Sequence, residues 1–326
     1  MTKFLLVSIL CATSWVTAQA QPITDYAQTI TDKELKELLY VYASDFFAGR
    51  EAGTKGQKLA VDFLRDYYIE NGIQPAAGTD NSYFQKMELK IKGTTIATEN
   101  VVAIIPGTEK PEELIVITSH LDHIGTHDGE INNGADDDGS GTVAMLEIAE
   151  AFKNAADQGY GPKRSILFLH VSAEEKGLLG SKYYVENPLY PLENTVANLN
   201  IDMIGRTDPK RTDKDPNYIY LIGADRLSQE LHNISEATNN KYTQLKLDYT
   251  FNAENDPNRF YFRSDHYNFA KNNIPIIFYF NGTHADYHKP SDTVDKIIFP
   301  LLEKRTKLIF YTLWELANRK ERIKLK

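Results

Sequence analysis

Three adjacent aspartates, Asp136, Asp137 and Asp138, lie between glycines in the stretch NNGADDDGSGTVAMLEIAE, directly before an apolar run. Neighbouring carboxylates repel one another, and folding gains nothing obvious from placing three of them at the start of a predicted helix. A bound cation reverses this balance, because a loop that repels itself when empty becomes favourable around positive charge. The triplet therefore predicts a metal-binding loop.

Other residue types that bind metals follow four apolar, strand-like runs. These residues are His120 and Asp122 after LIVITS, Glu174 and Glu175 after SILFLHVSA, Asp202 after VANLNI, and His284 and His288 after PIIFYFNGT. In open α/β sheets ligands bind beyond the carboxyl ends of the strands, so one edge of a sheet can collect them all.

The chemistry of this set favours zinc. Two imidazoles and three carboxylates with no thiolate suit two Zn²⁺ ions that share a bridging carboxylate and a water molecule. Two such ions roughly 3.5–4 Å apart serve hydrolases, in which one polarises the scissile carbonyl and both acidify the water. We therefore expect two zinc ions per chain.

The elements that must position these residues alternate between strand and helix. Short runs of branched and aromatic residues predict strands at 99–107, 113–120, 164–172, 195–204, 218–224 and 274–282. Helical patterns lie at 141–157, 225–238 and 299–319. Near-continuous apolar strands separated by helices predict an α/β sheet that is covered on both faces.

Two further helices are expected near the start of the chain. Thr31 and Glu34 form a capping-box pattern before the first, and the second runs from Leu59 and closes at Gly72. No Pro-, Ser- or Gly-rich linker divides the chain, and the polar loop 206–217 is too short for a domain boundary. The sequence therefore predicts one domain.

Composition limits the partners of this protein. Of its 326 residues, 42% are hydrophobic and 25% charged, and the formal net charge is −9. This negative charge argues against nucleic acid, which requires a basic face. Beyond the first 20 residues no apolar run is long enough for a membrane span, and nothing indicates a partner protein.

The start of the chain reads as an export signal. Lys3 precedes the apolar stretch 4–16, and Ala18 and Ala20 fit the small-residue rule for cleavage. We therefore expect a signal peptide at 1–20, a catalytic domain at 21–326, and a periplasmic or extracellular protein. The single cysteine, Cys11, follows Leu10, so a lipid anchor is a minor alternative, and the exported chain would have no disulfides.

The motifs of the chain resemble those of a known family. SHLDH, NNGADDDGSG, AEEKGLLGS, NIDMIGR and DYHKPSDT occur in family order, and the resemblance runs from GREAGTKG to KPSDTVDKI. The family is that of the secreted bacterial co-catalytic di-zinc aminopeptidases, which also includes glutamate carboxypeptidases and glutaminyl cyclases. The resemblance implies a single-domain zinc-exopeptidase fold with a central mixed, largely parallel sheet, and a peptide substrate.

The resemblance also implies a role for each matching residue. Asp137 would bridge the ions, with His120 and Asp202 completing one site and Glu175 and His288 the other. Glu174 would be the general base, and Tyr287 would stabilise the developing oxyanion. Asp122 would hold the far nitrogen of His120, and Asp265, in FRSDHYNFA, would support the pocket. Taken singly, such residues are often helix caps or turn residues.

The other histidines do not match the motifs. His123 and His127 are off pattern, His170 reads as a satisfied core residue, and His232 as an exposed helix residue. His284 and Asp286 are placed at the rim of the pocket.

Three alternatives to an aminopeptidase stay open. One is a glutaminyl cyclase with one zinc. Another is a carboxypeptidase, which needs a basic clamp such as Arg206, Arg259 or Arg263. The third is a binding protein with an inactive site.

Overall fold

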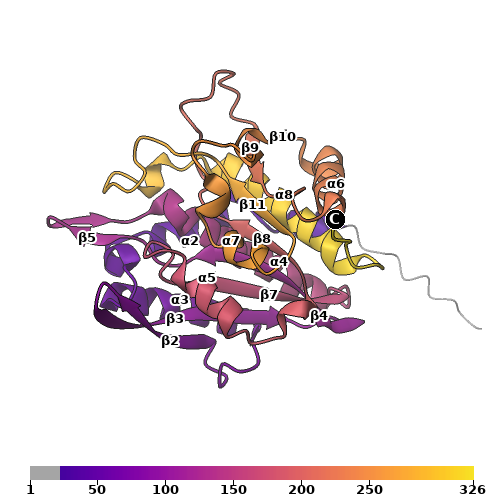
Figure 1. Ribbon diagram of the computed structural model, residues 1–326, viewed down its shortest axis with the longest axis horizontal. Coiled ribbons are helices and arrows are strands. Elements are labelled where there is room, and N and C mark those ends of the chain that lie inside the picture. Colours follow the sequence, from indigo (N-terminus) through magenta and orange to yellow (C-terminus); the bar gives the residue numbers. More distant parts are fainter. Residues whose placement is uncertain (1–22) are drawn as a thin grey trace, which may run out of the picture.

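A central sheet organises the protein. The computed structural model describes residues 23–326, so the predicted signal peptide and Cys11 lie outside it. Within this range nine strands form the sheet, in the order β1-β3-β7-β4-β8-β11-β9-β10 with β2 paired to β3 (Figure 1). Their bounds are β1 Gln74–Pro75, β2 Phe84–Ile91, β3 Thr94–Ile105, β4 Lys110–His120, β7 Arg164–Val171, β8 Thr195–Ile201, β9 Tyr218–Ile222, β10 Lys246–Asp248 and β11 Ile276–Phe280.

The direction of the strands confirms the expected mixed sheet. The central strands β7, β4, β8 and β11 are parallel to their neighbours within this block, whereas β3 and β9 flank the block in antiparallel pairings. Each of the six predicted strands is present. Three strands of the sheet were not predicted: the short strands β1 and β10, and β2, an edge strand whose outer half alternates exposed and half-buried positions. Because the parallel strands share a direction, their carboxyl ends meet at one edge of the sheet.

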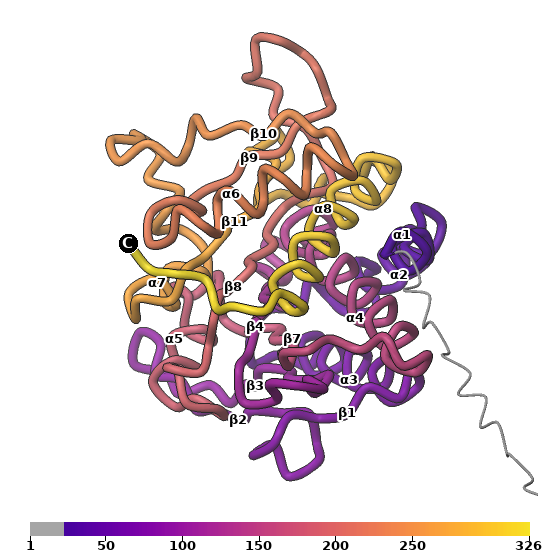
Figure 2. Tube along the Cα trace, turned by 90° about the vertical axis from the view of Figure 1, so that its right-hand side faces the viewer, coloured from indigo at the N-terminus to yellow at the C-terminus, as the bar shows by residue number. Residues whose placement is uncertain are grey.

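Helices cover both faces of the sheet, as predicted. Figure 2 shows α1, α2 and α4 on one side and α5 and α7 on the other. The helix bounds are α1 Ile23–Ala27, α2 Asp32–Tyr42, α3 Lys55–Glu70, α4 Gly141–Asp157, α5 Leu179–Glu186, α6 Gln229–Thr238, α7 His266–Ala270 and α8 Phe299–Asn318. In β7, Ile166 and Phe168 join the core under α4 and α8, while Leu167 and Leu169 join the core on the opposite face.

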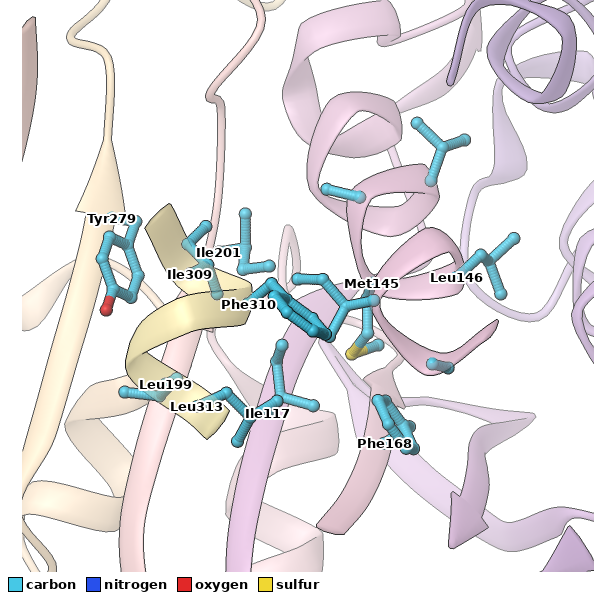
Figure 3. Close-up of a cluster of buried hydrophobic side chains, with 14 of the residues drawn as sticks. Ile117, Met145, Leu146, Phe168, Leu199, Ile201, Tyr279, Ile309, Phe310 and Leu313 are labelled. Carbon is cyan, nitrogen blue, oxygen red and sulfur yellow. The ribbon is translucent and has the colours of Figure 1, made fainter. Parts of the chain in front are cut away.

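The larger core forms the rigid support of the carboxyl edge. Met145 of α4 and Phe310 and Leu313 of α8 pack over Ile117 and Phe168 of the sheet (Figure 3). All five side chains are fully buried. Burial of each stabilises the fold by about 1.5–3 kcal/mol, so loss of one would loosen the strands that carry the site.

Local sequence signals set the ends of the helices. Thr31 caps α2 by accepting a hydrogen bond from the backbone N–H of Glu34 at 3.2 Å. The helix predicted from residue 225 begins later, at Gln229, because Ser228 caps it through the N–H of Leu231. The polar loop 206–217 connects β8 and β9 as an insertion in the single domain. None of the helices within 23–326 has the length and apolar character needed to cross a bilayer.

Candidate metal centre

The metal-binding residue types meet beyond the carboxyl ends of the parallel strands. Two groups have ligand atoms that all lie within 4.8 Å of one another. The first contains His120, Asp137 and Asp202, and the second contains His123, Asp137 and Glu175. Asp137 belongs to both groups, which is the arrangement that a bridging carboxylate requires.

Short distances connect the members of these groups. His120 Nε2 lies 3.1 Å from Asp137 Oδ1 and 3.7 Å from Asp202 Oδ1. His288 Nε2 lies 3.2 Å from Asp137 Oδ2 and 3.1 Å from Glu175 Oε2. Tetrahedral zinc with bonds of about 2.0–2.1 Å places its ligands about 3.3 Å apart, so the spacing fits zinc.

Unsatisfied polar atoms point to the same conclusion. Asp137 Oδ2 and Glu175 Oε1 are buried without a hydrogen-bond partner among the described residues. Buried polar atoms are normally hydrogen-bonded, and an unpaired one costs about 1–3 kcal/mol. A donor set of imidazole and carboxylate that leaves its lone pairs free suits a divalent cation of borderline softness such as zinc.

The three adjacent aspartates have three different tasks. Asp138 accepts backbone N–H groups of His120 and Gly141 at 3.1 and 3.0 Å, and that of Met203 at 3.1 Å. It thereby joins the ends of β4 and β8 to the start of α4. The carboxyl oxygens of Asp138 thus hold backbone, not metal.

Hydrogen bonds also occupy both oxygens of Asp136, but with different partners. It accepts the N–H of Gly205 at 2.7 Å, the hydroxyl of Ser140 at 3.0 Å, and contacts His284 Nε2 at 3.1 Å. His284 therefore holds this aspartate, and the expectation that it lines the rim of the pocket is wrong. Asp137 alone of the triplet keeps an oxygen free for a metal.

Two residues outside the expected set position the aspartate loop. Asp292 Oδ2 accepts the backbone N–H groups of Asp136 and Asp137 at 3.0 and 3.2 Å. Arg50 is fully buried and donates to the carbonyls of Leu121, Asn133 and Gly134, which flank the site. Both lie in motifs noted in the sequence, KPSDT and GREAGTKG, but their long-range partners were not predictable.

Asp122 supports the site differently from the expectation. The Nδ1 of His120 lies 3.0 Å from the backbone carbonyl of Asp122, so the main chain and not the carboxylate holds this ring. The carboxylate instead accepts the N–H of Glu174 at 3.1 Å. Two residues after His120, the carbonyl is within easier reach of the imidazole, and the side chain is free to span the gap to the next strand.

Asp265 lies behind the same segment. Its Oδ1 accepts a hydrogen bond from Ser181 at the start of α5, which follows the two glutamates in sequence. Burial raises the pKa of Asp265 to about 7.

Glu174 and Glu175 experience opposite electrostatic environments. Burial raises the pKa of Glu174 well above its usual range. Burial alone would also raise the pKa of Glu175, but His123 and His288 lower it overall. Glu174, which readily takes a proton, is thus adjacent in sequence to Glu175, which stays ionised.

A pocket opens onto this centre. Its lining includes Glu174 and Tyr287, together with His120, Asp137, Asp202 and His288, and its apolar lining residues include Met203, Phe260, Phe278 and Phe280. The Tyr287 ring stacks on His288 with centroids 3.9 Å apart. Of the three candidate arginines, Arg263 lines this pocket, whereas Arg206 pairs with Asp286 at 3.0 Å and Arg259 lies over Phe262.

The remaining histidines lie in the core, on the surface and at the candidate metal site. His170 contacts Tyr68 and Ser119 within the core, as interpreted. His232 was expected to be exposed but is half-buried beside the Tyr249 ring. His127 is exposed in the hairpin of β5 (Gly125–His127) and β6 (Glu130–Asn132). His123, the last residue of the SHLDH motif, joins the second metal group, although its place in that motif was not expected to make it a ligand.

An α/β sheet whose carboxyl edge carries a buried cluster of carboxylates and imidazoles beside a pocket is typical of metal-dependent hydrolases. The chain belongs to peptidase family M28, whose family model matches residues 100–313. The resemblance seen in the motifs is thereby confirmed, and so, at the level of the family, is the expectation of a zinc metallopeptidase.

Similar proteins include enzymes of several kinds. Aminopeptidase YwaD of Bacillus subtilis is 26% identical over 256 residues, which cover 78% of this chain and 52% of that protein. The chain thus matches about half the length of this curated relative. Leupeptin-inactivating enzyme 1 of Streptomyces exfoliatus is 32% identical, over 52% of this chain and 35% of its own.

Solved structures share the fold. The LapA aminopeptidase of Legionella pneumophila superposes with a TM-score of 0.71 at 23% identity, covering 98% of this chain and 80% of that one. The glutaminyl cyclase of Porphyromonas gingivalis gives 0.68 at 19% identity, covering 87% of this chain and 97% of that one.

Proposed function

We propose that this protein is an exported aminopeptidase that hydrolyses N-terminal peptide bonds with two zinc ions. The observation that carries the proposal is the pair of metal-binding groups that share Asp137 at the mouth of a pocket lined by Glu174. In this proposal His120, Asp137 and Asp202 hold one ion, and Asp137, Glu175 and His288 hold the other.

The chain's own residues supply the proton transfers and the orientation. Two zinc ions would polarise the scissile carbonyl and acidify the attacking water. Glu174, which lines the pocket, takes the proton of the attacking water and delivers it to the departing amine. Tyr287, at the pocket wall, donates its hydroxyl hydrogen to the oxygen on which negative charge develops.

The alternatives differ in metal number and substrate. A glutaminyl cyclase with one zinc leaves the second group of ligands without a purpose. A carboxypeptidase would use Arg263, the one candidate arginine on the pocket, to hold a terminal carboxylate. A binding protein with an inactive site would have no need of Glu174 beside the metal groups.

Metal analysis and a substrate panel test the proposal together. We expect about two zinc ions per chain, cleavage of aminoacyl-anilides and free peptides, and no cleavage of N-acylated peptides. Removing zinc with a chelator should abolish cleavage, and adding zinc should restore it. Release of C-terminal residues from acylated peptides would indicate a carboxypeptidase, and cyclisation of glutaminyl peptides a cyclase.

Export is the second part of the proposal. Its support is the charged and apolar start of the sequence and the small residues before Gln21. We expect N-terminal sequencing of the mature protein from the periplasm or medium to begin at Gln21. A mature protein that begins at Met1, or that carries an acyl group on Cys11, would contradict this expectation.

A further inference from the structure

His123 is a buried histidine that has no part in the function proposed above. It follows β4, its side chain is fully buried, and neither ring nitrogen has a hydrogen-bond partner in the part of the chain described. A core histidine such as His170 instead uses both nitrogens, on Tyr68 and Ser119. The His123 ring therefore differs from the ring of a core histidine, because the core around it does not occupy its two nitrogens with hydrogen bonds.

The free nitrogen of His123 faces the second metal group. Nδ1 lies 2.8 Å from Glu175 Oε1 and 3.9 Å from Asp137 Oδ2, and these two oxygens also have no hydrogen-bond partner. The other oxygen of Glu175 lies 3.1 Å from His288 Nε2, so two imidazoles flank one carboxylate. One nitrogen and two oxygens of the types that bind zinc thus converge within 4.8 Å of one another, which indicates a shared cation.

The backbone holds the ring in this position. Gly134 has a φ of +54°, and a Cβ there would lie 2.6 Å from Cγ and Cδ2 of His123. The absence of a side chain at Gly134 thus makes room for the ring. The backbone N–H of His123 donates to the carbonyl of Arg50 at 3.4 Å. The imidazole is therefore seated by its surroundings and is not a mobile side chain near the site.

We propose that His123 is a ligand of the same metal as Asp137, Glu175 and His288, an inference that rests on the two-zinc function proposed above. This position then has four protein ligands, whereas the other has three, His120, Asp137 and Asp202. Zinc sites with four protein ligands are closed, and sites with three keep a position for water or substrate. The pocket agrees with this asymmetry, because His120 and Asp202 both line it, whereas His288 lines it but His123 and Glu175 do not.

Zinc titration of the metal-free protein tests the proposal. The variant His123→Asn places an amide near the position of Nδ1, so it keeps a polar group beside Glu175 but loses the imidazole ligand. Changes in residues that only support a ligand cost about 10–100-fold in metal affinity, so loss of a ligand should weaken one zinc by about 100-fold or more. The affinity for the other zinc should change far less. His127→Asn, in the exposed hairpin nearby, is the matched control and should bind as wild type does.

Counting the imidazoles bound to zinc in the wild-type protein gives a test that does not depend on whether a variant folds. X-ray absorption of the wild-type protein with two zinc ions should detect about 1.5 imidazoles per zinc if His120, His123 and His288 all bind, and about 1 otherwise. A value near 1, or a folded His123→Asn protein that binds two ions with wild-type affinities, would overturn the proposal. A wild-type protein that binds fewer than two ions would instead refute the two-zinc function itself.

Discussion

Replacing Glu174 by glutamine should lower kcat by about 10²–10⁴-fold while the zinc content and the fold stay normal. Glutamine keeps the shape and hydrogen bonding of the side chain but cannot accept a proton from the attacking water. KM should change little, because the proton transfer belongs to the transition state. Steady-state kinetics and metal analysis of the purified variant measure both quantities.

Glu175→Gln should behave in the opposite way. Glu175 contacts His123 and His288 at 2.8 and 3.1 Å, and its pKa is lowered, as a ligand that must stay ionised requires. We therefore expect weaker metal binding and an activity that added zinc partly restores. Glu130→Gln, an exposed glutamate of β6, serves as the control for the change of charge. If Glu174→Gln loses zinc and Glu175→Gln keeps it, the two roles are reversed.

Asp137→Ala should have the largest effect on metal binding, because the same carboxylate belongs to both groups. Both ions should be weakened together, whereas His120→Ala should affect mainly one. Zinc at about 100 times its dissociation constant stabilises a protein by about 2.7 kcal/mol per site, so the rise in melting temperature on adding zinc should nearly disappear in Asp137→Ala.

Replacing the neighbouring Asp138 should affect the melting temperature differently from replacing Asp137. Asp138 accepts three backbone N–H groups, so Asp138→Ala should lower the melting temperature even when no metal is bound. Metal-free Asp137→Ala should lose less stability than metal-free Asp138→Ala, because the Asp137 carboxylate contacts the imidazoles of His120 and His288 and accepts no backbone N–H among the described residues. Melting curves with chelator and with zinc measure both. Two tightly bound ions in Asp137→Ala would show that it is not the bridge.

The sequence by itself determined the class of fold and the edge at which the site lies. Apolar runs that match β4, β7, β8 and β11 are local signals, and each ends at a potential ligand or within eight residues of one. Parallel strands must bring those ends to one edge, so the site could be expected without knowing any distance. The order of the motifs then identified the family.

Only the tertiary structure decided how neighbouring residues of the same type divide their tasks. Asp136, Asp137 and Asp138 are equivalent in sequence, yet Gly205 and Met203, more than 60 positions away, donate to two of them and leave Asp137 free. The role of His123, the last residue of SHLDH, could not be predicted because it depends on Glu175, 52 positions later, and on the space above Gly134. The physical reason is that hydrogen bonds and metal ligation depend on distances of about 2–3 Å between atoms, which packing sets and sequence spacing does not.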